Sequence, residues 1–113
     1  MEIHLQNLLH ELYESGQQND SHEQERSKKM LNLEPDTAQL VSILIRSSQR
    51  KQLLEIGTSN GYSTIWLAWT ARSTSGHVIS IDRDEHKLLQ PMSTYSEHIY
   101  ASSSIFFMAM PAK

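Results

Sequence analysis

The sequence predicts an α/β fold in which helices come first and a parallel β-α-β-α unit follows. Apolar residues recur at steps of three and four near the amino terminus, as they do in an amphipathic helix. Two short apolar runs, 53–56 and 77–81, have the length of buried strands, and a helical segment separates them. A strand, a helix and a second strand in this order form the unit from which doubly wound sheets are built.

Residues 1–50 are expected to form a helical cap. The first helix has one apolar face, and Gly16 with Asn19 and Asp20 is expected to end it. Residues 17–29 are polar and indicate a solvated loop or an exposed helix. A second helix is expected from Glu34, because Pro35 suits the first helical position and acids favour the amino end. Its apolar positions predict a broad face made of Leu40, Val41, Ile43, Leu44 and Ile45.

Residues 51–90 hold the strand-helix-strand-helix unit. Residues 53–56 predict a buried parallel strand that ends at Gly57. A helix is expected from Tyr62, with residues 73–76 as its stop. Residues 77–82 predict a second buried strand whose last residue is an acid, and residues 84–90 open another helix.

Composition narrows the classes of function. The chain has 113 residues, a formal net charge of −3 and no cysteine. Its basic residues are scattered, so no nucleic-acid partner is expected. The lack of cysteine excludes disulfides and thiolate metal sites. Neither a signal-peptide pattern nor a run of about 18 apolar residues is visible, so a cytoplasmic protein without a membrane partner is expected.

The turn between the first strand and the following helix carries the functional signal. It runs from Gly57 to Gly61, and Asp82 ends the next strand. Glycines allow a tight turn and the close approach of a ligand to the backbone, while free N–H groups at the helix start favour an anion. Asp82 lies 21 positions after Gly61, close to the spacing of about 20 at which an acid receives ribose hydroxyls. The arrangement predicts a nucleotide-type cofactor site.

Several classes of protein could use this geometry. Ser59 and Tyr62 occupy the positions of the second and third glycines of G-x-G-x-x-G. The turn therefore lacks two of the glycines that allow a dinucleotide pyrophosphate to bind. The G-x-S-x-G pattern would make Ser59 a hydrolase nucleophile, but a single strand-like run precedes it. Asp82 could also cap the next helix, although its spacing argues for the ribose. A nicotinamide-type fragment and a non-enzymatic module that binds a partner through its helical amino terminus both stay open.

Residues 54–64, 66–68 and 78–82 together resemble the motif I and motif II region of the class I S-adenosylmethionine (SAM)-dependent O-methyltransferase family, in its catechol/caffeoyl-CoA-like branch. The resemblance extends from about Met30 to Gln90. It implies a Rossmann-like fold, of which this chain holds the amino-terminal helices and the first β-α-β-α. It also implies an enzyme that transfers a methyl group from SAM to a hydroxyl of a small molecule.

The same resemblance implies which residues hold the cofactor. The glycines with Tyr62 and Ser63 would bind the methionine portion, and the Ser63 hydroxyl would reach its carboxylate. Glu55 would anchor the turn or the amino group, and Asp82 would take the ribose hydroxyls. The full predicted set of cofactor-binding residues is Glu55, Gly57, Ser59, Gly61, Tyr62, Ser63 and Asp82.

The resemblance further implies what the chain lacks. The family's metal-binding acid, its neighbouring lysine and the segments that close the substrate pocket have no counterpart here, so no catalytic or metal-binding residue is predicted. The six histidines lack ligand spacing such as H-x-x-x-H, and Trp66 and Trp69 are expected to pack. We therefore expect a truncated, inactive methyltransferase. The intact family implies a divalent metal and a small-molecule methyl acceptor, and a homo-oligomer stays open.

Residues 91–113 are predicted to be a frameshifted tail. They begin with proline, contain a serine cluster and have no helical period. Reading each codon's first two bases with the preceding wobble base can convert residues 105–113 into Asp-Phe-Phe-His-Gly-Asp-Ala-Arg-Glu, which resembles the family's sequence after motif II. A one-base deletion or two-base insertion near codons 88–91, followed by an early stop, is the hypothesis.

Overall fold

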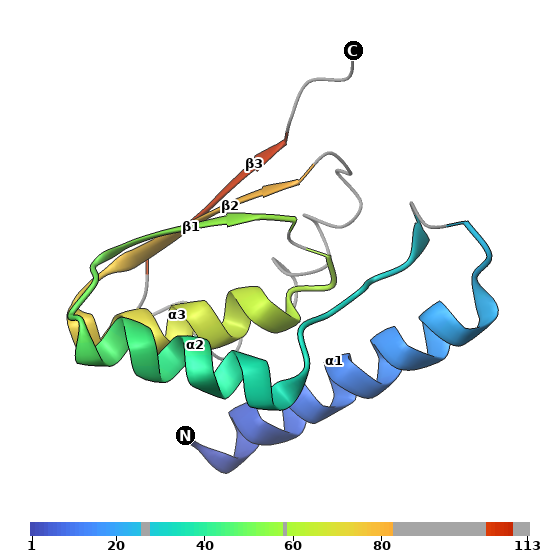
Figure 1. Cartoon of the computed structure of the whole chain (residues 1–113), viewed down its shortest axis with the longest axis horizontal. Helices are drawn as coiled ribbons and strands as arrows, with labels where there is room; N and C mark the ends of the chain where they lie inside the picture. Colours follow the sequence, from blue (N-terminus) through green and yellow to red (C-terminus); the bar gives the residue numbers. More distant parts are fainter. Residues whose placement is uncertain (26–27, 58, 83–103, 110–113) are drawn as a thin grey trace.

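The computed structural model of the chain describes residues 1–25, 28–57 and 59–82, and the backbone of 104–109. Helices precede a β-α-β unit, which confirms the predicted order (Figure 1). The helix predicted for 84–90 lies outside the described residues. The elements are α1 (Ile3–His22), α2 (Pro35–Ser47), β1 (Gln52–Ile56), α3 (Tyr62–Thr74), β2 (His77–Asp82) and β3 (Ser104–Ala109).

The strands form a parallel sheet in the order β1-β2-β3. In its register Leu54 lies opposite Ile79, and Ile56 lies opposite Ile81. Strand β3 is not predicted from the sequence and falls inside residues 91–113, which are predicted to be a frameshifted tail. Its apolar run, Ile-Phe-Phe-Met, is rich in residues that favour strands, and it pairs through the backbone with β2. Among the described elements, β1 therefore forms one edge of the sheet.

The three helices lie on the same side of the sheet (Figure 1). Helix α3 contacts β1 and β2, and both α2 and α1 contact α3. Because α3 has neighbours on several sides, seven of its residues are buried, and both apolar and hydroxyl side chains are among them. The core is centred on α3 and also includes residues of α1, α2 and β2. It consists of Leu5, Leu9, Ala38, Tyr62, Ile65, Ala68, Ala71 and Val78.

Helix α1 does not end at Gly16, so this prediction is wrong. The helix runs on to His22. Gly16 is buried where the chain passes over α1 again, and a Cβ there would lie 2.5 Å from Asn32 Nδ2 and 3.5 Å from Met30 Cβ. A glycine inside a helix costs about 1 kcal/mol relative to alanine. Close packing of the later segment explains its presence here better than helix termination does.

Helix α2 begins at Pro35, with Asp36 in its first turn, as predicted. Its apolar face is not the buried one, however, because Leu40, Ile43 and Leu44 are each more than half exposed. The fully buried positions are the small residues Ala38 and Ser42. Small side chains let α2 approach α3 closely, and the Ser42 and Thr70 hydroxyls meet at 2.6 Å between the two helices.

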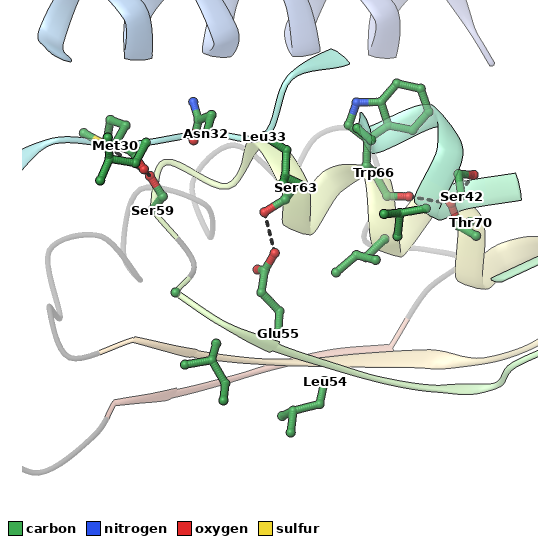
Figure 2. Close-up of a pocket in the computed structure, with 16 residues that line it drawn as sticks. Met30, Asn32, Leu33, Ser42, Leu54, Glu55, Ser59, Ser63, Trp66 and Thr70 are labelled. Atoms are coloured by element: carbon green, nitrogen blue, oxygen red, sulfur yellow. Dashed lines mark hydrogen bonds between the residues drawn. The ribbon is translucent and has the colours of Figure 1, made fainter. Parts of the chain in front are cut away.

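Strand β1 was predicted to be buried, but it is half exposed. Leu54 and Ile56 are 64% and 76% exposed. Glu55 points toward the helices, whereas Leu54 lies on the opposite side of the strand (Figure 2). No helix of the described residues covers that side, so the alternation of side chains along β1 separates a buried face from an open one.

Candidate functional site

The turn after β1 has a backbone that suits close ligand approach. Gly57, Ser59 and Gly61 all have positive φ, at 96°, 56° and 92°. The N–H of Gly57 donates to the carbonyl of Ile81 at 2.6 Å, which ties the turn to β2. A Cβ added at Gly57 would meet nothing within 4 Å. Glycine at position 57 therefore permits the left-handed backbone conformation and leaves the space beside the turn open.

Glu55 places a carboxyl group under the start of α3. It is 8% exposed and accepts a hydrogen bond from Ser63 Oγ at 2.5 Å (Figure 2). It also accepts hydrogen bonds from Ser80 Oγ at 2.7 Å and from the Thr64 hydroxyl. Burial raises the pKa of Glu55, and the three hydroxyl donors only partly offset this shift. A cationic group placed beside this carboxyl would stabilise its charged form.

Ser59 connects the turn to two other parts of the site. Its N–H donates to Asp82 Oδ2 at 3.1 Å, so the acid at the end of β2 lies directly beside the turn. Its hydroxyl donates to the carbonyl of Met30 at 2.6 Å (Figure 2). The turn, the carboxylate at the end of β2 and the segment before α2 are therefore held together by one residue.

A cavity of about 400 Å³ opens beside these groups (Figure 2). Four of the predicted cofactor residues line it: Glu55, Gly57, Ser59 and Ser63. Asp82 is not part of the lining but adjoins it through its hydrogen bond with Ser59. The rest of the wall comes from Leu54 and Ile56 of β1, from α2, from α3 and from the segment Met30–Leu33.

Gly61 and Tyr62 do not line this cavity. Gly61 is the N-cap residue of α3. Tyr62 is 3% exposed, and its ring packs 5.4 Å from the ring of Tyr13 on α1. Burial raises the pKa of Tyr62. Gly61 therefore shapes the turn and Tyr62 packs against α1, and the structure brings neither residue to the cavity.

The segment Met30–Leu33, which we call the strap, is part of the site but is not predicted from the sequence. All four of its residues line the cavity. Asn60 is likewise not predicted. Its Nδ2 donates to the carbonyl of Leu12 at 2.8 Å, and its Oδ1 accepts the Tyr62 N–H at 3.2 Å. The only sequence signal for the strap was an apolar run that directly precedes a helix start, which is common in loops of every kind.

The described residues contain neither a metal-binding cluster nor a membrane-spanning helix. No group of three or more histidine, aspartate or glutamate side chains among them could hold a metal ion. In the same part of the chain, none of the helices has the length and apolar character needed to cross a bilayer.

Among curated proteins, the chain is similar to a catechol O-methyltransferase of Niastella koreensis. The two are 35% identical over 54 residues, which cover 48% of this chain and 24% of that protein. Among solved structures, it matches the methyltransferase PaMTH1 of Podospora anserina, bound to S-adenosylhomocysteine (SAH), with a TM-score of 0.71 and 15% identity. That match covers 92% of this chain and 42% of the other.

A second solved structure, the Bacillus cereus O-methyltransferase in complex with SAH, matches with a TM-score of 0.66 and 23% identity, over 90% of this chain and 43% of that one. The chain thus spans less than half the length of these proteins. At such identities the likeness shows the fold, a Rossmann-like methyltransferase fold. The sequence pattern of the O-methyltransferase family, in turn, matches residues 2–108. The chain therefore belongs to the O-methyltransferase family.

Proposed function

We propose that this chain forms a SAM site for methyl transfer to a hydroxyl of a small molecule. The observation that carries the proposal is the cavity where Glu55, Gly57, Ser59 and Ser63 converge, with Asp82 beside it. The open space at Gly57 is where a side chain would otherwise block a ligand. The two solved relatives described above bind SAH, which is SAM after loss of its methyl group.

The residues present fit the chemical groups of SAM. The buried Glu55 carboxyl suits the ammonium of the methionine portion, because a cation offsets the cost of burying its charge. The Ser63 hydroxyl and the N–H groups at the start of α3 suit the carboxylate. Asp82 suits the ribose hydroxyls, which donate to a carboxylate. SAM itself would supply an electrophilic methyl group on its sulfonium.

Calorimetric titration of the chain with SAH and, separately, with NAD tests this proposal. We expect saturable binding of SAH and none of NAD. Asp82→Asn should weaken SAH binding about tenfold, because hydrogen bonds to a charged group are worth roughly 1.5–3 kcal/mol. Asp36→Asn, at an exposed acid in the first turn of α2, is the matched control and should bind like the parent chain.

Binding of NAD in place of SAH would favour the nicotinamide alternative. Binding of neither by a folded chain would favour a non-enzymatic module. We also propose that this chain alone is inactive, because no group of side chains among its described residues could hold the divalent metal that the family resemblance implies. Methyl transfer from labelled SAM to catechol should then be absent. Turnover by the chain alone would contradict the proposal that it is an inactive portion.

We further propose that the protein resides in the cytoplasm and that the reading frame changes near codons 88–91. The coding DNA, read in all three frames, tests the frameshift. Methyltransferase sequence that continues in another frame past the stop would support it. The in-frame residues 104–109 form β3, and the family match extends to residue 108, so a frame without such continuation would leave these residues as native family sequence.

A further inference from the structure

The strap crosses the cavity without any regular secondary structure of its own, so its backbone groups need partners elsewhere. Two such partners come from a single side chain on α1. Asp20 Oδ1 accepts the N–H of Met30 at 2.6 Å, and Asp20 Oδ2 accepts the N–H of Leu31 at 2.9 Å. Asn19 also donates to Asp20 Oδ1 at 3.1 Å. The last turn of α1 therefore holds the first two residues of the strap by hydrogen bonds.

The strap backbone that hydrogen-bonds to Asp20 is strained at Leu31. Leu31 has a φ of 50°, in the left-handed region, which a branched side chain rarely adopts. Leu31 is also 52% exposed, so burial of its side chain does not hold this conformation. The two hydrogen bonds to Asp20 compensate for the strain. Without them, the strap is expected to relax toward negative φ and move at the cavity wall.

The hydrogen bonds continue from the strap to the turn between β1 and α3. Met30, whose N–H binds Asp20, offers its carbonyl to the Ser59 hydroxyl at 2.6 Å. The N–H of Ser59 in turn donates to Asp82 at 3.1 Å. Ser59 itself has a φ of 56°, so the strap and the turn each hold a residue in the left-handed region. A continuous set of hydrogen bonds thus joins α1 to the carboxylate beside the cavity.

We propose that Asp20 is a positioning residue for cofactor binding, which acts through the strap and Ser59 without touching the ligand. The proposal rests on the proposed function, since it concerns the same cavity. Asp20 lines a neighbouring hollow on the α1 side of Leu31 and Asn32, not the cofactor cavity. Its effect on the ligand would therefore be indirect.

The test compares Asp20→Ala, Asp20→Asn and the parent chain in SAH titrations. Asp20→Ala should weaken SAH binding about tenfold, on the scale expected for hydrogen bonds to a charged group. Asp20→Asn keeps one acceptor oxygen and should recover part of the loss, whereas Glu11→Ala, an exposed acid on the same helix, should change nothing. Circular dichroism of each variant should match that of the parent chain, which would show that the loss of binding does not come from unfolding.

A ligand-free measurement separates this proposal from the proposed function. Hydrogen exchange of the Met30 and Leu31 amides should accelerate in Asp20→Ala, and the Ser59 amide should follow. Combining Asp20→Ala with Ser59→Ala should weaken binding by less than the product of the single effects, because both release the same strap. A parent chain that binds no SAH overturns the proposed function and this inference with it. A parent chain that binds SAH, with variants that bind equally well, overturns this inference alone.

Discussion

Glu55 is the residue whose chemistry depends most on its surroundings. A carboxyl group at 8% exposure loses most of its hydration, and three hydroxyl donors replace part of it. This carboxyl group connects β1 to α3 and β2, and under the proposed function it would also meet the ammonium group of SAM. Folding and ligand binding favour different protonation states of Glu55, because burial favours the neutral acid whereas an ammonium ligand would favour the carboxylate.

This conflict predicts a pH effect on stability. Because burial raises the folded-state pKa of Glu55, its contribution to stability is fully present below the pKa of the unfolded chain and is lost as pH rises through the folded-state value. Glu55→Gln should remove this loss. Urea unfolding across a pH series should therefore show the variant gaining on the parent chain as pH rises, within about 1 kcal/mol at any pH because the hydroxyl contacts adjust.

Glu11→Gln provides the control for this comparison, since Glu11 is exposed on α1. It should leave the pH dependence of unfolding unchanged. SAH binding should respond in the opposite sense, because Glu55→Gln deletes the charge that the ammonium would meet. If the Glu55→Gln variant lost the same stability relative to the parent chain at every pH, the argument that burial of charge dominates at this position would be contradicted.

At the scale of elements, the turn from α3 into β2 is determined by two adjacent residues. A Cβ on Gly76 would lie 2.3 Å from the carbonyl oxygen of Lys51, which also accepts the His77 N–H at 2.8 Å. Gly76→Ala must therefore shift the start of β1 against β2, and it should destabilise the chain by about 1–3 kcal/mol. Thermal unfolding and the loss of strand signal in circular dichroism would measure this effect.

Ser75 offers the reverse change in the same turn. It has a φ of 55° at the C-cap of α3, where glycine would adopt the left-handed backbone without strain. Ser75→Gly should stabilise the chain by up to about 1 kcal/mol, because it removes this strain and introduces no clash. Destabilisation by Ser75→Gly would mean that the serine contributes a contact that outweighs its backbone strain.

The contact between α2 and α3 predicts unequal effects of its two hydroxyls. Thr70 Oγ1 bonds both the Ser42 hydroxyl at 2.6 Å and the carbonyl of Trp66 at 2.8 Å. Ser42→Ala leaves Thr70 with its carbonyl partner and should cost about 1 kcal/mol. Thr70→Val deprives the buried Ser42 hydroxyl of its partner and should cost about 1–3 kcal/mol. Urea midpoints of the two variants would show the order.

Local patterns were sufficient to predict where most elements begin. Pro35 at the start of α2, and the glycine turn between β1 and α3, act through backbone conformations that the residue type itself dictates. Predictions failed where tertiary contacts override local preference. Gly16 by itself predicts a helix end, but in the structure it permits close packing of the strap. The apolar face of α2 points outward because small residues pack against α3.

The site was partly predictable for the same reason. Glu55, Gly57, Ser59 and Ser63 lie within nine residues of sequence, so the strand-turn-helix pattern brings them together without further information. The strap reaches the cavity only through its contacts with α1 and the turn, which no local pattern encodes. Asp20 was placed in a polar region expected to face solvent, and its role depends on an 11-residue separation from Leu31.

For the whole molecule, the sheet has two unequal faces. Val78 and Ser80 on β2 are fully buried beneath the helices, whereas Leu54 and Ile56 on β1 are largely exposed. Their register partners Ile79 and Ile81 lie on the same side of the sheet. Leu54, Ile56, Ile79 and Ile81 together form an apolar patch. It lies beside β1, which is an edge strand among the described strands. Such an edge is a template for association with another chain.

This patch predicts self-association of the purified chain. Ile56→Lys places a charge on the open face at a position that is 76% exposed, so it should reduce association with little effect on folding. Sedimentation velocity over a concentration series would measure the change, and circular dichroism would check the fold. Ile3→Lys, at a residue that is 62% exposed on α1, is the control and should leave association as in the parent chain. If both lysine variants dispersed the chain equally, general charge repulsion would account for the effect, and the open sheet face would have no special part in it.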